Sequence, residues 1–389
     1  MLDAILEALK GLGAGAQFLY THGGPNIVML LIAGVMFYLA VAKDVEPLLL
    51  LPIGFGCLLS NLPLSELMGH DGVLRTLYDM GIGNELFPLL IFVGIGSMTD
   101  FTPLLAEPKL LLFGAAGQLG IFLTLLLALA LGFSKEAAVS VAAIGACDGP
   151  TVIYVSNMFA DLGKIDTAMV GALAVAAYSY MALVPIIQPP IMRLLTTKKE
   201  RETKMPPVRG KVSKTALIAF PIIVTAITGI IAPKGLPLMG MIMLGNFMKV
   251  SGAVTRLCKA SENEIANIST LFLGLAIGGT MAGGEFLKMQ TLMVFGLGLV
   301  AIVTDTVGGV LLGKLWYYLS GGKVNPLVGA AGISAYPMAA RLVQTEGQKA
   351  NKHNFLLMHA MGANTGGQIG SVMAAAIMLA VLKGLGVIP

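Results

Sequence analysis

Residues 142–155 read AAIGACDGPTVIYV and place a single carboxylate within an apolar run. Gly149-Pro150 follows Asp148 directly, and proline can neither donate a backbone hydrogen bond nor continue a regular helix. A helix that breaks at membrane depth frees backbone carbonyls, which together with a carboxylate form an all-oxygen site suited to a hard cation. The stretch therefore predicts a broken helix with a cation site at Asp148. The alternative is an aspartate that only caps the following half-helix.

The composition of the whole chain indicates a membrane protein. Of the 389 residues, 56% are hydrophobic and only 12% are charged, and the mean hydropathy is +0.84. A soluble domain carries about 25% charged residues, whereas a helical membrane span takes about 20 apolar residues. The 49 glycines agree, because small residues let membrane helices approach closely. We therefore predict an all-α polytopic membrane protein of about ten to twelve segments, some of them half-helices or re-entrant.

The chain divides into four regions. Residues 1–24 have apolar residues at helical spacing, which predicts an interfacial helix or, alternatively, a frayed terminus. Residues 25–195 and 215–389 are two apolar halves. The linker 196–214 between them, TTKKERETKMPPVRGKVSK, carries seven Lys/Arg against two Glu, and the positive-inside rule places it in the cytoplasm. No connection is long enough for a soluble domain, so any nucleotide-, biotin- or CoA-binding module must belong to another polypeptide.

The two halves resemble each other. Residues 90–114 can be laid over residues 271–296, and residues 144–150 fall opposite residues 328–334 at nearly the same offset. Weak internal symmetry with interrupted spans at matching places is typical of transporters built from two inverted repeats. The alternative is that glycine-rich apolar sequence aligns with itself by chance.

Polar residues of the second half surround another interruption, NPLVGAAGISAYPMAAR (325–341). Asn325 precedes a proline, and Ser334 and Arg341 lie seven residues apart, so they could share a helix face if the helix resumes across Pro337. The planar guanidinium of Arg341 suits a carboxylate. Arg341 could instead be the positive end of a membrane span.

Two further spans carry candidates. Asn364, Gly367 and Ser371 form a stripe of small and polar residues on one helix face. Helix packing alone would explain Gly367 and Ser371, but it explains Asn364 less well. Tyr178 and Tyr180 precede three prolines, and either tyrosine could relay a proton or lie at the membrane interface.

The remaining candidates are weaker. Asp100 is predicted to cap a helix, and Asp305 is either a structural polar residue or a second cation ligand. Cys57, Cys147 and Cys258 are scattered and odd in number, which supports neither a disulfide framework nor a zinc site. No phosphate-binding loop or nucleophile elbow occurs in a usable context, and nothing indicates nucleic-acid binding.

Taken together, these motifs resemble those of one known family. GNELFPLLIFVGIGSMTDFTPLL, ACDGPT, AAYSYMALVPIIQPPIM, NPLVGAAGISAYPMAAR and GANTGGQIGS resemble the beta subunit of the sodium-ion-translocating biotin-dependent decarboxylases, from about residue 80 to the C-terminus. This family serves oxaloacetate, methylmalonyl-CoA and glutaconyl-CoA decarboxylases. The resemblance implies a subunit in the cytoplasmic membrane of a prokaryote that decarboxylates carboxybiotin, takes up a proton and exports sodium.

The resemblance also implies partners and residue roles. The partners would be a biotin carrier, a carboxyltransferase (alpha) subunit and a small membrane-anchor subunit, with assembly into a homo-oligomer such as a trimer. Sodium ligands would be Asp148, Asn325, Ser334 and Asn364, with Gly149, Pro150 and Gly329 as motif residues. Catalysis would involve Arg341, Tyr180 and Ser334, and carboxybiotin would contact Arg341 and Asn364.

Two alternatives have no enzymatic role. A secondary cation antiporter or sodium/solute symporter would use the same inverted repeats and the same cation site. A scaffold within a membrane complex would explain the basic linker but not Asp148, Asn325 and Asn364.

Overall fold

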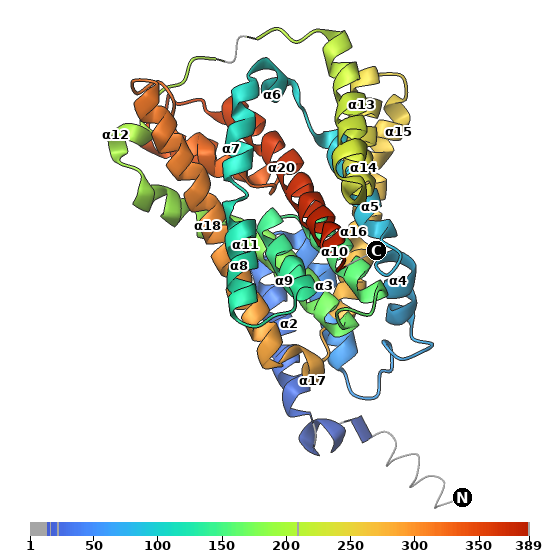
Figure 1. The fold of residues 1–389 in the computed structure, drawn as a ribbon. Helices are drawn as coiled ribbons and strands as arrows, with labels where there is room; N and C mark the ends of the chain where they lie inside the picture. Colours follow the sequence, from blue (N-terminus) through green and yellow to red (C-terminus); the bar gives the residue numbers. More distant parts are fainter. Residues whose placement is uncertain (1–13, 16, 22, 208–209, 388–389) are drawn as a thin grey trace, which may run out of the picture.

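The computed structural model describes residues 14, 15, 17–21, 23–207 and 210–387, and every regular element within them is a helix, as predicted (Figure 1). Most of the interfacial helix predicted for residues 1–24 lies outside the described residues. Six helices are long and apolar enough to cross a membrane, or seven if the pair α4–α5, bent by 59°, is one span. Several other apolar helices have only 13 to 16 residues, which agrees with the prediction that some segments are half-helices.

The helices form two groups that pack mainly within themselves. The outer group consists of α2 (Gly24–Ala42), α3 (Pro47–Asn61), α4 (Val73–Gly81), α5 (Leu86–Met98), α13 (Lys214–Ile231), α14 (Leu236–Ser251), α15 (Thr255–Ala260) and α16 (Ala266–Gly279). The central group consists of α6 (Thr102–Ala106), α7 (Leu111–Ala116), α8 (Leu119–Ala130), α9 (Lys135–Ala142), α10 (Gly149–Asp161), α11 (Thr167–Leu195), α18 (Met289–Leu319), α19 (Met338–Ala350) and α20 (Leu357–Gly384). Short pieces are α12 (Lys198–Arg201), α17 (Gly283–Phe286), the 3-10 helices η1 (Pro108–Leu110), η2 (Ala143–Ala146), η3 (Pro233–Gly235) and η5 (Pro326–Gly332), and the π-helical η4 (Ser261–Ile265).

Packing in the outer group is reciprocal. Helix α3 of the first half packs on α16 of the second, and α14 of the second half packs on α5 of the first. Glycines bring both pairs into close backbone contact. A Cβ added to Gly278 would lie 2.0 Å from the carbonyl oxygen of Ile53, and one added to Gly245 would lie 2.1 Å from that of Val93. If the two halves have the same order of helices, α3 corresponds to α14 and α5 corresponds to α16. The two contacts are then equivalent.

The linker crosses one end of the molecule and is fastened to the second half (Figure 1). The side-chain amide of Asn325 donates to the carbonyls of Arg201 and Thr203, each at 2.9 Å, and the amide of Asn354 donates to Arg201 at 3.0 Å. Both ring nitrogens of the buried His359 on α20 face acceptors: Glu107 Oε2 at 3.1 Å and Pro206 O at 2.8 Å. The described part of the linker is therefore held by several separate contacts.

The close helix contacts lead to a stability prediction. Gly245→Ala should lower the thermal stability of the purified protein, because the new methyl group must displace α5, and overpacking costs about 1–3 kcal/mol. Gly240→Ala in the same helix meets nothing within 4 Å and should be neutral or slightly stabilising. The measurement is a thermal melt of both variants in detergent. Equal melting temperatures would show that α5 and α14 are not in close contact.

Candidate functional site

The first broken segment runs from α9 through η2 to α10, with Asp148 at the break. Cys147 adopts a left-handed backbone (φ 53°), which turns the chain just before Asp148. Asp148 is the N-cap of α10, and its Oδ1 accepts the N–H of Thr151 at 2.7 Å. Pro150 stands in the first turn, where its missing N–H costs nothing. Asp148 therefore does cap α10, as the alternative interpretation of the sequence stated.

Asp148 also contacts the second half of the chain. The hydroxyl of Ser371, on α20, donates to Asp148 Oδ2 at 3.2 Å, and the hydroxyl of Ser334 donates to Ser371 Oγ at 2.6 Å. Ser334 follows η5, the second broken segment. None of the three residues is more than 3% exposed. The structure therefore brings both interruptions together in one buried hydrogen-bonded chain, which capping alone does not require.

Oxygen atoms without partners accompany this chain. Asn364 donates from Nδ2 to the carbonyl of Ile333 at 2.5 Å, and Gln368 donates from Nε2 to that of Ser334 at 3.4 Å. Asn364 Oδ1, Gln368 Oε1 and Thr151 Oγ1 are buried and have no hydrogen-bond partner. A buried polar atom left unpaired costs about 1–3 kcal/mol, and oxygen acceptors around one carboxylate suit a small hard cation. We call these residues the polar cluster: Asp148, Thr151, Ser334, Asn364, Gln368 and Ser371.

Of the two candidate tyrosines, Tyr178 lies next to Asp148. A Cβ added to Gly149 would lie 2.1 Å from Tyr178 Cζ, so the ring packs directly on the glycine that follows Asp148. The Tyr178 hydroxyl is buried without a partner. The Tyr180 hydroxyl donates to the carbonyl of Phe295 at 2.5 Å, on α18. Residues two apart point to different sides of a helix, so only one of these tyrosines can face the cluster.

Asn325 and Gly329 lie elsewhere. Asn325 caps η5, its Oδ1 accepting the N–H of Leu327 at 3.0 Å, while its amide nitrogen holds the linker. All of its side-chain polar atoms are therefore used within the protein. Gly329 lies against α18, where an added Cβ would be 1.9 Å from the carbonyl oxygen of Gly309. The structure brings Asp148, Ser334 and Asn364 together but assigns Asn325 to the linker contact.

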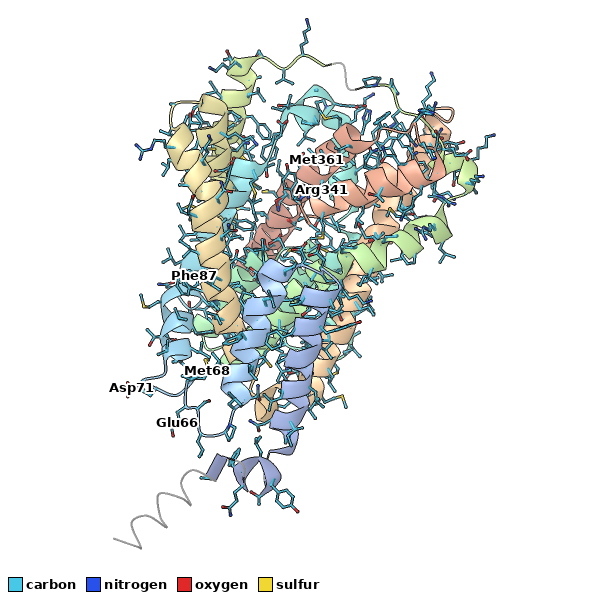
Figure 2. All side chains as sticks on the ribbon, turned by 180° about the vertical axis from the view of Figure 1, so that it is seen from behind. Glu66, Met68, Asp71, Phe87, Arg341 and Met361 are labelled. Carbon is cyan, nitrogen blue, oxygen red and sulfur yellow. The ribbon has the colours of Figure 1, made fainter. Side chains whose placement is uncertain are left out.

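Arg341 is exposed on α19, in the part of the molecule that carries the linker (Figure 2). Helix α19 begins at Met338, so Ser334 lies outside it. Ser334 and Arg341 therefore do not share a helix face, although their spacing in the sequence allowed one. Arg193 holds Glu346 of the same helix with two hydrogen bonds of 2.6 and 2.8 Å, and this contact lowers the pKa of the Glu346 carboxyl. The Arg341 guanidinium itself has no hydrogen bond or ion pair among the described residues.

Asp100 and Asp305 have structural partners. Asp100 Oδ1 accepts the N–H of Thr102, the first residue of α6, at 2.9 Å, although Phe101 is the N-cap residue of that helix. Asp305 is fully buried on α18 and accepts the N–H of Gly120 at 2.5 Å, in the first turn of α8. Its second oxygen has no partner. This contact agrees with the structural interpretation of Asp305.

Residues 25–382 match the family model of the Na+-transporting oxaloacetate decarboxylase beta subunit. The chain belongs to this family. It is 47% identical, over 98% of its length and 100% of the relative, to the methylmalonyl-CoA decarboxylase subunit beta of Veillonella parvula. The same figures hold for the glutaconyl-CoA decarboxylase subunit beta of Acidaminococcus fermentans. Identity to the oxaloacetate decarboxylase beta chain of Klebsiella pneumoniae is 42%, over 96% of this chain and 99% of the relative.

Membership settles the broad class of the protein. The chain is a beta subunit of a sodium-translocating decarboxylase and a multi-pass membrane protein of a prokaryote. The three relatives are named for decarboxylases of three different substrates, yet their sequence identities to this chain are similar. The expected family resemblance, enzymatic class and membrane location are confirmed, and the alternatives without enzymatic activity are set aside.

The two tyrosines lead to a paired prediction. Tyr178→Phe should change the sodium concentration for half-maximal decarboxylation, because it removes a free hydroxyl beside Asp148. Tyr180→Phe should leave that concentration unchanged and cost about 1 kcal/mol of stability, because it removes only the hydrogen bond to Phe295. Sodium titrations and thermal melts of both purified variants separate the effects. The reverse pattern would place Tyr180, as the resemblance implies, in the sodium-coupled step.

Proposed function

We propose that this subunit decarboxylates carboxybiotin brought by a biotin carrier, takes up a proton, and uses the reaction to export sodium through the polar cluster. The observation that carries this proposal is the buried chain from Asp148 through Ser371 to Ser334, which joins the two broken segments. A carboxylate at membrane depth is costly unless a cation or hydrogen bonds compensate it. Sodium, the cargo named in the family description, fits that requirement.

The sodium site would consist of Asp148 together with neutral oxygens. The carboxylate offsets the dehydration of the ion, and Asn364 Oδ1, Gln368 Oε1 and the hydroxyls of Ser334 and Ser371 supply further ligands. The free acceptors in the polar cluster support this assignment. Within the described residues, no three His, Cys, Asp or Glu side chains are placed to hold a metal, so a site for a transition metal has no support.

Arg341 would bind the carboxylate of carboxybiotin. Its free guanidinium can donate two parallel hydrogen bonds to a carboxylate. In the reaction the bond between the biotin nitrogen and the carboxyl carbon breaks, its electron pair stays on nitrogen, and that nitrogen takes a proton as CO2 leaves. The anion that Arg341 holds thus disappears during the step. Moving one charge against 100 mV costs about 2.3 kcal/mol, and this change in local charge can couple the reaction to transport.

The proposed assembly rests on the names of the relatives. We propose that a carboxyltransferase subunit, a biotin carrier and a small membrane-anchor subunit complete the complex, because the relatives are beta subunits of decarboxylases. Homo-oligomer formation belongs to the same proposal. We also propose that residues 25–195 and 215–389 are two inverted repeats, which the reciprocal packing of α3 on α16 and α14 on α5 supports.

The orientation gives a prediction that does not depend on catalysis. Lys204→Cys in the exposed part of the linker should react with a membrane-impermeant thiol reagent only from the cytoplasmic side. Asp71→Cys, in the α3–α4 loop at the other end of the molecule (Figure 2), should react only from outside. The native cysteines are all buried. Labelling of the linker from outside would reverse the orientation.

The central test concerns Asp148. Asp148→Asn keeps the size of the side chain but removes its charge, so it should abolish sodium transport and sodium-stimulated decarboxylation together. Ser371→Ala should raise the half-activating sodium concentration roughly fivefold, the equivalent of one neutral ligand worth about 1 kcal/mol. Asp305→Asn is the control for a buried carboxylate and should keep the wild-type curve. The measurement is decarboxylation against sodium concentration in reconstituted complexes. A wild-type sodium curve for Asp148→Asn would place the site elsewhere.

A further inference from the structure

His359, in the first turn of α20, lies where three parts of the chain meet. Its Nδ1 is 3.1 Å from Glu107 Oε2, and its Nε2 is 2.8 Å from the carbonyl oxygen of Pro206. Glu107 stands between α6 and η1 in the first half, whereas Pro206 belongs to the linker, which passes α6 on its way from α12 to α13 (Figure 1). The histidine is only 3% exposed. One buried side chain of the second half therefore joins the first half and the linker.

The two contacts of His359 together require a proton. A neutral imidazole has one N–H and one bare nitrogen, so beside an ionised Glu107 it can donate to only one of the two acceptors. Its bare nitrogen would then face an oxygen lone pair. Both contacts form when the pair holds one additional proton, either as imidazolium beside carboxylate or as neutral imidazole beside carboxylic acid. The His359–Glu107 pair therefore holds Pro206 only in its protonated state.

Pro206 belongs to a short segment of the linker, residues 205–207, which we call the strap. All three of its residues line a cavity of about 560 Å³, together with Glu107, Lys323 and His359. Proline has no backbone N–H, so Pro206 and Pro207 can be held only through their carbonyl oxygens and by packing. The contact between His359 and the Pro206 carbonyl is thus a polar fastening of the strap at the edge of the cavity.

Separate contacts hold the linker on both sides of the strap. On one side, the side-chain amide of Asn325 donates to the carbonyl of Thr203 at 2.9 Å. On the other side, Gly210 packs on Ala106, where an added Cβ would lie 2.6 Å from the carbonyl oxygen. Release of Pro206 would therefore free the strap while these flanking contacts keep the rest of the linker in place.

Few charged groups surround the His359–Glu107 pair among the described residues. Lys323, from the loop between α18 and η5, lines the same cavity. The helices α6, α7 and η5 have no charged side chains, and Lys109 of η1 is exposed and does not line the cavity. Helix α19, which also packs on α20, carries three charged groups outside the cavity lining: Arg341, Glu346 and Lys349.

The buried carboxylate of the polar cluster is not part of this environment. Asp148 meets α20 at Ser371, which follows His359 by twelve residues, or about 18 Å along the helix axis. Glu107 and Lys323 are therefore the charged side chains that share the cavity with His359.

We propose that the His359–Glu107 pair is a proton-dependent latch that closes the strap over the cavity. When the pair loses its additional proton to water, one ring N–H is left for two acceptors. The charged Glu107 is the stronger acceptor, so the contact to Pro206 opens and the cavity becomes accessible to solvent. Return of the proton closes the strap again. The latch does not involve the proposed sodium and carboxybiotin sites, and its test is independent of them.

The test measures the accessibility of the strap in the purified full chain in detergent. Met205→Cys places a reporter thiol in the strap, and Lys211→Cys, at an exposed position of the same linker, corrects for ionisation of the thiol. The native cysteines are all buried. The ratio of the two alkylation rates should rise roughly fivefold, the equivalent of one hydrogen bond, between about pH 5 and about pH 9, which includes the interval in which histidine ordinarily changes charge. A ratio that stays constant with pH would overturn the latch.

Variants of the pair should shift this ratio in opposite directions. In Glu107→Gln the amide N–H can donate to Nδ1 of a neutral ring while Nε2–H stays on Pro206, so the ratio should be low at every pH. His359→Leu removes the fastening, so the ratio should be high at every pH. Lys323→Gln is the control, because it removes the other charge of the cavity but not the latch, and it should keep the wild-type rise.

The outcomes that contradict the latch are equally specific. If Glu107→Gln keeps the wild-type rise, the carboxyl group does not take part in it. If His359→Leu has a low ratio, packing alone closes the strap. If Lys323→Gln abolishes the rise, the titrating group is not the His359–Glu107 pair.

Discussion

A helix that breaks inside a membrane leaves backbone donors and acceptors that water cannot reach, and the protein must satisfy them itself. The positions of the buried polar side chains follow from this requirement. Asp148 accepts a free N–H at the start of α10, and Asp305 does the same for α8. Gln118 donates to the carbonyl of Gly114 at 3.0 Å and to that of Gly332 at 3.2 Å. The proposed sodium site would use the second oxygen of Asp148, which Ser371 contacts, together with the unpaired acceptors of the polar cluster.

The outer and central groups differ in how their helices meet. In the outer group, glycines at the contact between α3 and α16 allow the backbones of the two helices to pack directly against each other. In the central group, the irregular segments pack against α18 and α20 and present polar atoms to each other. The close helix contacts and the polar interior are therefore built from different residue types.

Much of this arrangement could be predicted from sequence, for a physical reason. The break at Asp148 and the involvement of Ser334 and Ser371 could be found because charge, proline and small polar residues are rare in apolar spans. Tyr178 could not be separated from Tyr180, because the choice depends on the rotation of α11. The role of Asn325 was also out of reach, since its partners are linker carbonyls more than a hundred residues away. A common face for Ser334 and Arg341 required a helix that resumes across Pro337, and sequence could not decide this point; α19 begins only after that proline.

The distance in sequence between bonded partners has a consequence for how the protein is made. Asp148 and Ser371 are separated by 223 residues, so at about 5–20 residues per second the ribosome needs about 11–45 s to supply the second after the first. During that interval Asp148 can already cap α10, but its contact with Ser371 has not yet formed. The contact between Asn325 and the linker is delayed in the same way, because Asn325 follows Arg201 by 124 residues. The proposed sodium site is consequently incomplete in a nascent chain until α20, the final helix, has been inserted.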